Sequence, residues 1–263
     1  MDFPLPQRKL STMPRATAAL RPAAVDPTVY PTEDKMGEES LQRFIVELLR
    51  PLVERWLAEK KVLAFTGADQ FVYWRQHDAT RRVAPHVFVL PGVRPGRRIK
   101  SWKVWEHGIT PSFALEVVSA DVDKDYVDAP AAYGDLGVDE LVLFDPDHET
   151  APGRVAFQVF RRTKKHGLVR IESTSADRVK SRALGCWLRA VGVGDALRLR
   201  LATGPRGDDL VPTAEEYERG EKERERGEKE RERGEKERER EARLAAEAEI
   251  ARLRALLEKK RER

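Results

Sequence analysis

Two strand-like segments of this sequence each carry one ionisable side chain among apolar residues. His86 lies within residues 83–90, and Glu116 lies within residues 112–119. Buried strands rarely carry an ionisable group unless it is paired or binds a metal. Two neighbouring strands that direct such groups to the same place predict a metal-dependent hydrolase site. His86 is unusual in such a site, because a hard ion such as Mg²⁺ prefers oxygen ligands and favours a carboxylate there.

The remaining pattern predicts the elements that would position these two side chains. A helix is expected from Glu38 onwards, because apolar residues recur at helical spacing between Leu41 and Trp56, and Pro51 should bend or split it. A short helix is expected at 130–136, with Asp128 as its N-cap and Gly137 as its stop. Strands are expected at 62–66, 70–74, 83–90, 112–119, 140–144, 155–161, 168–172, 186–191 and 196–201. This order predicts a mixed α/β domain with one central sheet.

Composition restricts the class of protein. The chain has 263 residues and a net charge of +4, so bulk charge does not single out nucleic acid as a partner. Its single cysteine, Cys186, excludes an internal disulfide and fits a reducing, cytoplasmic location. No apolar run approaches the roughly 18 residues of a membrane span, and the first residues lack the apolar segment of a signal peptide. We therefore expect a cytoplasmic protein without a membrane partner.

The two ends of the chain differ from the part between them. Residues 1–29 are rich in Pro, Ala and Arg and predict a disordered tail, which leaves residues 30–203 as the folded domain. Residues 204–209 are interpreted as a linker to a charged tail that ends at residue 263. From Gly220 a seven-residue unit occurs three times, with three Glu and three Lys or Arg in each unit. It has no apolar position and therefore offers no coiled-coil seam.

Only the last part of the tail, between Leu244 and Leu257, has apolar residues at helical spacing. This stretch is either a marginal single helix or a short coiled coil that forms a homodimer. Because the charged repeat buries nothing, removal of residues 205–263 is expected to leave a folded domain with a lower oligomeric state.

Several ordered motifs match one known family. They are Val83-Ala-Pro-His-Val-Phe-Val, Pro111-Ser-Phe-Ala-Leu-Glu-Val-Val-Ser, Asp125, and Tyr133-Gly-Asp-Leu-Gly-Val-Asp-Glu-Leu-Val-Leu-Phe-Asp-Pro. Over about residues 30–203 the chain resembles the Uma family of restriction-endonuclease-like proteins, within the PD-(D/E)XK nuclease superfamily. The resemblance implies a restriction-endonuclease-like mixed central sheet flanked by helices. It also implies DNA cleavage with Mg²⁺ or Mn²⁺, by an Asp after a Pro, a Glu on the next strand, a Lys, and often a Glu on the first helix.

The chain departs from this family pattern at two positions. His86 follows Pro85 where the family has Asp, and Ala129 stands where the family has its alternative Lys, four residues before Tyr133. The nearest lysine is Lys124, which could reach the site only from a loop. The remaining acidic candidates are Glu116, Asp125, Glu38 and Glu39.

Each candidate also has a purely structural interpretation. His86 could be a hydrogen-bonded imidazole in a decayed site, and Glu116 could be a buried carboxylate paired with it. Asp125 could cap a helix or fix a loop, and Glu38 and Glu39 are favoured by the dipole of a helix first turn. If a metal does bind, His86 and Glu116 are its expected ligands, and imidazole suits Mn²⁺ or Zn²⁺ better than Mg²⁺.

A basic cluster near Trp102 could contact phosphates or could be an ordinary solvated loop. Its members are Arg94, Arg97, Arg98, Lys100 and Lys103. Because the family Asp and Lys are both absent, we favour a catalytically degenerate protein that binds DNA or a protein without a metal cofactor. The alternatives are an active endonuclease with Glu116 as principal metal ligand, and an assembly protein that acts through its coiled-coil tail.

Overall fold

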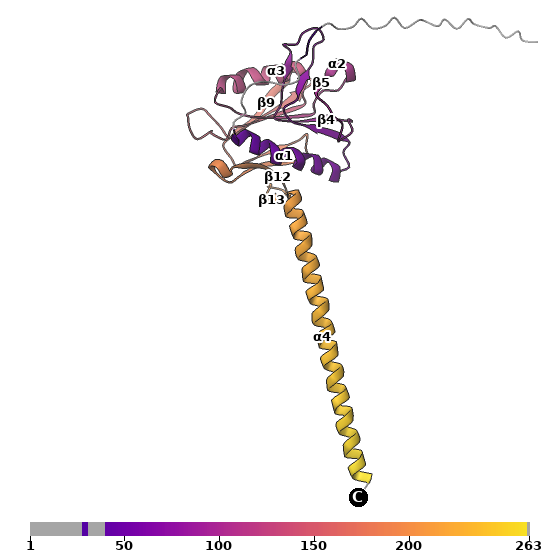
Figure 1. Cartoon of the computed structure of the whole chain (residues 1–263). Coiled ribbons are helices and arrows are strands. Elements are labelled where there is room, and N and C mark those ends of the chain that lie inside the picture. Colours follow the sequence, from indigo (N-terminus) through magenta and orange to yellow (C-terminus); the bar gives the residue numbers. More distant parts are fainter. Residues whose placement is uncertain (1–27, 31–39, 262–263) are drawn as a thin grey trace, which may run out of the picture.

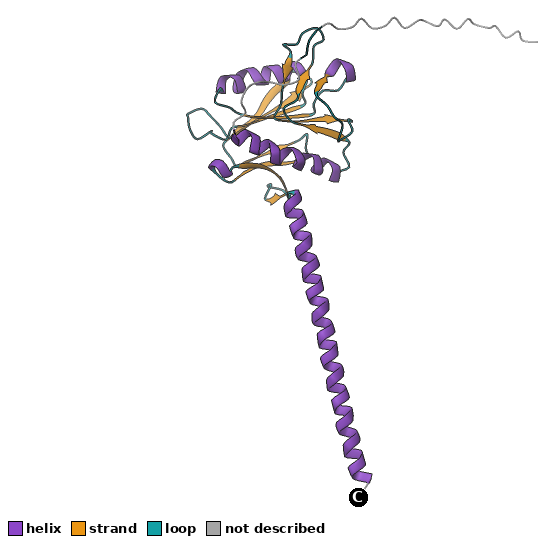
Figure 2. Ribbon diagram, viewed as in Figure 1, coloured by secondary structure: helices purple, strands orange, loops and turns teal. Residues whose placement is uncertain are grey.

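The computed structural model of the protein describes residues 28–30 and 40–261. The predicted helix residues Glu38 and Glu39 lie outside the described residues. So does the predicted N-terminal tail, except for Thr28 and Val29. The centre of the fold is a six-stranded sheet with the order β1-β4-β6-β7-β8-β9 (Figures 1 and 2). Its strands are β1 (Ala64–Gly67), β4 (Val87–Pro91), β6 (Phe113–Val117), β7 (Glu140–Phe144), β8 (Phe157–Thr163) and β9 (Gly167–Thr174). Strands β6 and β7 are parallel and all other neighbours are antiparallel, so the sheet is mixed, as predicted.

Helix α1 (Ser40–Glu59) packs between this sheet and a second one. The second sheet has four strands: β10 (Arg178–Ser181), β11 (Cys186–Val191), β12 (Arg198–Thr203) and β13 (Asp209–Leu210), with the 3₁₀ turn η2 (Gly194–Ala196) before β12. Leu49 and Val53 of α1 are fully buried in this layer, and the Trp56 indole N–H donates to the carbonyl of Leu184 at 2.8 Å. α1 is thus an internal helix covered on two sides.

The opposite face of the central sheet is covered by α3 (Ala129–Leu136) and a third sheet. That sheet contains β2 (Phe71–Tyr73), β3 (Arg82–Val83) and β5 (Ser101–Lys103), and the short helix α2 (Val104–His107) follows it. Alternation along β4 separates the two layers: Val87 and Val89 pack on the α1 side, whereas Phe88 and Leu90 pack on the α3 side. The prediction of one central sheet was therefore incomplete, because two smaller sheets complete the layers.

The segment predicted as one strand at residues 83–90 is two strands in different sheets. β3 pairs with β2, and β4 pairs with β1 and β6. The chain changes sheet at Pro85, which has no N–H to donate to a strand ladder. The Pro85 carbonyl instead accepts a hydrogen bond from the N–H of Asp69 at 2.9 Å. His86 therefore lies at the entrance to β4 rather than inside a continuous strand.

One helix prediction was wrong in detail, the N-cap at Asp128. A π-helical turn, η1 (Lys124–Asp128), leads directly into α3, and Asp128 has helical dihedral angles (φ −77°, ψ −39°), so Asp128 is not an N-cap. Gly137 does end α3, in the left-handed conformation (φ 97°), as predicted. α1 is not split at Pro51, which lies on an exposed part of the helix.

The predicted linker is part of the folded domain. Residues 204–208 form the turn between β12 and β13, where Ala202 pairs with Leu210. Val211 follows, is only 5 % exposed, and belongs to the core around α1. The N–H of Val211 donates to the carbonyl of Leu201 at 2.9 Å. The sequence-based boundary after residue 203 therefore falls inside a hairpin.

Helix α4 (Ala214–Arg261) begins with a capping box. The Glu216 carboxylate accepts a hydrogen bond from the N–H of Thr213 at 2.8 Å, and the Thr213 hydroxyl accepts one from the N–H of Glu216 at 3.2 Å. Glu216 also receives the guanidinium of Arg200, at 2.7 Å, and this contact lowers the pKa of the Glu216 carboxyl. Arg200 is largely buried on β12, so the first turn of α4 is fixed to the domain.

The rest of α4 projects away from the domain as one helix (Figure 1). Its 48 residues correspond to about 72 Å at 1.5 Å per residue. Exposed ion pairs one turn apart follow the repeat, for example Glu232 with Lys236 at 2.6 Å. Leu244, Ile250 and Leu257 are 56 %, 51 % and 64 % exposed, so these three apolar side chains are not buried by the described residues. Dimerisation through it stays a prediction.

Within the described residues, none of the helices combines the length and the apolar character that crossing a bilayer requires.

Candidate functional site

His86 and Glu116 lie opposite each other where the inner strands β4 and β6 of the central sheet end. In the antiparallel pair of β4 and β6, Val87 is aligned with Leu115, so the next pair outward along the same register is His86 with Glu116. Parallel pairing of β6 with β7 ends at the same edge, at Val117 and Phe144. The expected juxtaposition of the two ionisable side chains is thus a consequence of strand register.

The two side chains are in direct contact. His86 Nδ1 is hydrogen-bonded to Glu116 Oε2, and the Tyr133 hydroxyl donates to Glu116 Oε1. The backbone nitrogen of Val117 lies 3.3 Å from His86 Nδ1, but one ring nitrogen cannot both donate to a carboxylate and accept from an N–H. Because a carboxylate only accepts, we assign the proton to Nδ1. His86, Glu116 and Tyr133 are thus linked by hydrogen bonds that engage both carboxylate oxygens of Glu116.

Tyr133 belongs to α3 and is fully buried. Burial raises the pKa of its phenol well above the ordinary value, and the neighbouring carboxylate of Glu116 raises it further. The carboxylates of Asp125 and Asp69 act on the phenol in the same direction. Tyr133 therefore remains a protonated hydrogen-bond donor to Glu116 at neutral pH. The matching of Tyr133 to a family motif was the only sequence signal for this contact.

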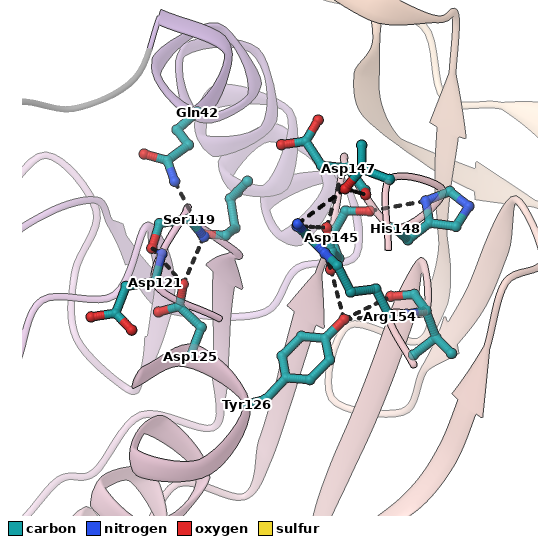
Figure 3. A network of polar contacts seen from close by, with 12 residues as sticks. Gln42, Ser119, Asp121, Asp125, Tyr126, Asp145, Asp147, His148 and Arg154 are labelled. Atoms are coloured by element: carbon teal, nitrogen blue, oxygen red, sulfur yellow. Dashed lines mark hydrogen bonds and ion pairs between the residues drawn. The ribbon is translucent and has the colours of Figure 1, made fainter. Parts of the chain in front are cut away.

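Asp125 acts on the Tyr133 phenol through its charge, but its carboxylate is hydrogen-bonded within its own loop, as Figure 3 shows. It is 6 % exposed, and its Oδ2 accepts the backbone N–H of Ser119 at 2.6 Å and the Ser119 hydroxyl at 2.7 Å. The carboxylate thereby fixes the turn that leaves β6. Gln42 of α1 approaches from the other side and donates to the carbonyl of Val117 at 3.3 Å. The sequence reasoning missed Gln42, although a polar residue at helical spacing from Ile45 and Leu49 was a usable signal.

A second hydrogen-bond network lies at the end of the neighbouring strand β7 (Figure 3). Asp145, only 1 % exposed, receives two hydrogen bonds from Arg154, at 2.8 and 2.6 Å, and one from the Tyr126 hydroxyl at 2.7 Å. The hydrogen bonds to Asp145 raise the pKa of the Arg154 guanidinium. Tyr126 follows Asp125 in η1, so this π-helical turn holds two strand ends at once. The sequence showed Asp145 only as the close of a strand.

Comparison with known proteins identifies the family. A family profile named Uma2 and described as "Putative restriction endonuclease" matches residues 31–191. The chain belongs to the Uma2 family. The crystal structure of "a putative nuclease belonging to DUF820" from Anabaena variabilis ATCC 29413 is similar, with 13 % identity and a TM-score of 0.39 over 56 % of this chain and 75 % of that one. A comparison with curated proteins found no match. The family predicted from the motifs is confirmed.

Within the residues that the structure describes, the donor set does not fit the metal that the family pattern implies. Among residues 28–30 and 40–261, no three side chains of His, Cys, Asp or Glu are grouped so that they could hold an ion. His86 and Glu116 are the two predicted ligands that come together, and they are hydrogen-bonded to each other. Mg²⁺ prefers an octahedral shell of oxygen atoms, and in this pair only the Glu116 carboxylate offers oxygen. Mn²⁺ accepts imidazole more readily, but two donors still form an incomplete site.

The predicted lysine does not complete this site either. Lys124 lies in η1 with an exposed side chain, one residue before the inward-facing Asp125. Ala129 lies one helical turn before Tyr133, and residues four apart lie on the same face of a helix. The family position for lysine is therefore on the face of α3 that reaches Glu116, where this chain has only a methyl group.

The predicted basic cluster divides into two groups. Arg94, Arg97, Arg98 and Lys100 are exposed in the loop between β4 and β5. Lys103, in contrast, pairs with Glu106 at 3.2 Å and lies over the ring of Tyr30 at 4.7 Å. The loop residues could meet an external anion, whereas Lys103 has partners within the chain.

Proposed function

We propose that this Uma2 protein is a catalytically degenerate restriction-endonuclease-like protein that binds DNA without cleaving it. The observation that carries the proposal is the pair of hydrogen bonds that link His86 and Tyr133 to Glu116. It uses both oxygens of the strand carboxylate and places an imidazole where the family pattern has a second carboxylate.

The chemistry of phosphodiester hydrolysis explains why this arrangement argues against catalysis. Carboxylates in such sites hold a divalent ion that polarises the phosphoryl oxygen and acidifies a bound water. A positive side chain then stabilises the developing negative charge. Here Glu116 already accepts from Tyr133 and His86, and Ala129 offers no charge. The free pair of carboxylates that would hold an ion and the positive side chain that would stabilise the developing charge are therefore both absent from this position.

Retention of DNA binding is supported by the loop between β4 and β5. This loop leaves β4 beside β1, where the N–H of Gly92 donates to the carbonyl of Leu63 at 2.8 Å. It returns to the far end of β1, where Gln70 donates to the carbonyl of Ile99 at 3.3 Å. Its exposed basic residues are thereby brought along the sheet edge toward the His86 end. Cationic loops of this kind contact phosphates without reading base sequence.

We expect the wild-type protein to bind duplex DNA but to show no cleavage of plasmid DNA with Mg²⁺ or Mn²⁺. Binding is measured by fluorescence anisotropy at fixed salt, and cleavage by conversion of supercoiled plasmid to nicked and linear forms. The control is Glu116→Ala, which removes the central carboxylate. Nicking at catalytic protein concentrations that disappears in Glu116→Ala would establish the active endonuclease instead.

We also expect that His86→Asp combined with Ala129→Lys creates metal affinity. The first change supplies a second strand carboxylate opposite Glu116, and the second restores the family lysine on the Tyr133 face of α3. Calorimetry should show Mn²⁺ binding at least about tenfold tighter than in a matched control, His86→Asn with Ala129→Lys, a difference of about 1.4 kcal/mol. Equal Mn²⁺ affinity in the two folded variants would show that this sheet edge is not the inherited metal site.

A further inference from the structure

A cavity of about 330 Å³ lies against the edge strand β1, on the side away from β4. Its lining includes Arg50 of α1, Thr66 and Gly67 of β1, Gln70, and Arg97 and Arg98 of the loop between β4 and β5. The cavity therefore brings together side chains from three separate segments of the chain. Its volume lies within the range of small-molecule sites and can hold one phosphate group with water.

The charges around the cavity favour an anion. Arg50 contacts Glu54 at 3.4 Å, and Glu54 also lines the cavity, so one of its three arginines has a counter-charge. Arg97 and Arg98 are exposed and form no ion pair with any described residue. Three arginines and one glutamate give a local charge of +2. Planar guanidinium groups match phosphate oxygens with paired hydrogen bonds, which makes phosphate a better ligand here than a halide.

Thr66 provides an independent observation. It is 2 % exposed, and its hydroxyl has no hydrogen-bond partner among the described residues. Buried hydroxyl groups are nearly always paired, so a hydroxyl of a cavity-lining residue that has no partner in the described chain is expected to pair with water or a ligand. Threonine hydroxyls commonly donate to phosphate oxygens. The cavity thus combines unneutralised cations with an unpaired polar group.

The wall that carries the two loop arginines is fixed to β1. The Oε1 of Gln70 accepts the backbone N–H of Ala68 at 3.2 Å, and its Nε2 donates to the carbonyl of Ile99 at 3.3 Å. One side chain therefore bridges the end of β1 and the residue that follows Arg98. This bridge holds the arginine loop beside Thr66 and reduces the entropy that ligand binding would otherwise cost.

The cavity also lies next to the candidate site. Gly67 is aligned with Phe88, two residues from His86, and Asp69 donates to the carbonyl of Pro85 at 2.9 Å. We propose that the cavity binds one phosphate of a nucleic-acid backbone and thereby positions the strand along the sheet edge beside His86 and Glu116. The inference rests on the proposed DNA binding and names the group that is recognised and the residues that recognise it.

The test compares two double variants of the full chain that remove the same charge from the same loop. Arg97→Gln with Arg98→Gln changes the cavity, whereas Arg94→Gln with Lys100→Gln changes positions outside its lining. Affinity for a labelled DNA duplex is measured at several salt concentrations. We expect a loss of about tenfold or more for the cavity variant and about threefold or less for the control, with a shallower salt dependence for the cavity variant. Thr66→Val, which keeps the shape and removes the hydroxyl, should also weaken binding without lowering the melting temperature.

Inorganic phosphate serves as a second probe that does not depend on DNA. It should raise the melting temperature of the wild type and of the Arg94/Lys100 variant, relative to chloride at equal ionic strength, but not that of the Arg97/Arg98 variant. If the wild type binds no DNA yet shows this selective protection, the phosphate site stands and the proposed DNA-binding function fails. A different result would exclude a phosphate site in the cavity. In that case DNA binds, but the two double variants lose the same affinity. Phosphate also changes the melting temperatures of both variants by the same amount.

Discussion

Replacement of Glu140 with alanine is expected to destabilise the protein by about 3–5 kcal/mol. Glu140 is the first residue of β7 and is 2 % exposed. Its carboxylate accepts hydrogen bonds from the Ser181 hydroxyl, from Arg161 Nε at 2.7 Å, and from the N–H groups of Arg182 at 3.0 Å and Ala183 at 3.4 Å. One side chain thus satisfies four donors from two other segments.

The cost is large because Glu140 joins two sheets. Arg161 belongs to the central sheet, whereas Ser181 ends β10 of the four-stranded sheet. Arg161 also donates to the carbonyl of Lys180 at 2.7 Å, so the same contact region contains a second link. Alanine would leave a buried hydroxyl, two N–H groups and a guanidinium without their acceptor, and each unsatisfied group costs about 1–3 kcal/mol.

The free energy of unfolding, obtained from urea titration, measures this effect. Glu149→Ala is the matched control, because the Glu149 side chain is 91 % exposed and its removal should change stability by no more than about 0.5 kcal/mol. Arg161→Ala combined with Glu140→Ala should cost less than the sum of the two single changes, since the residues share one interaction. A loss below about 1 kcal/mol for Glu140→Ala would show that the junction relaxes or admits water.

Local patterns predicted the strands best where apolar residues are continuous. The expected strands at 140–144 and 186–191 have the same bounds in the structure as β7 and β11. The juxtaposition of His86 with Glu116 was also predicted, because each side chain interrupts an apolar strand. Glu140 could not be distinguished from an ordinary strand end, since its partners come from residues 21 to 43 positions away.

Other errors came from chemistry that strand and helix periodicity does not encode. The change of sheet at Pro85 depends on which neighbours accept the two halves of an apolar run, and only tertiary structure decides that. The helix was predicted to begin only at residue 130, so the π-helical turn at Lys124–Asp128 was not anticipated. In contrast, Thr213 and Glu216 have the spacing of a capping box, so the start of α4 was visible in the sequence and was overlooked.

The expectation that residues 205–263 can be removed without loss of the fold has to be revised, because residues up to Glu216 contact the domain. A chain that ends at residue 204 should be less stable than one that ends at residue 220 by about 2.5–6 kcal/mol. The shorter chain loses the burial of Val211, worth about 1.5–3 kcal/mol. It also removes two partners of the largely buried Arg200, the carbonyl of Val211 at 2.9 Å and the carboxylate of Glu216 at 2.7 Å, at a cost of about 1–3 kcal/mol.

Urea titration of both truncated chains at several pH values tests this prediction and separates its two parts. Contact with Arg200 lowers the pKa of Glu216 below its ordinary value of 4.5, so this contribution is fully present above pH 4.5 and is lost as the pH falls through the lowered value. The difference in the free energy of unfolding between the two chains should therefore shrink in acid but not vanish, because Val211 does not titrate.

Light scattering of the chain that ends at 220 should show a monomer, while the full chain should show a concentration-dependent dimer if residues 244–257 associate. Equal unfolding midpoints for the two truncated chains would mean that the domain ends before β13 and that Arg200 finds water in place of Glu216.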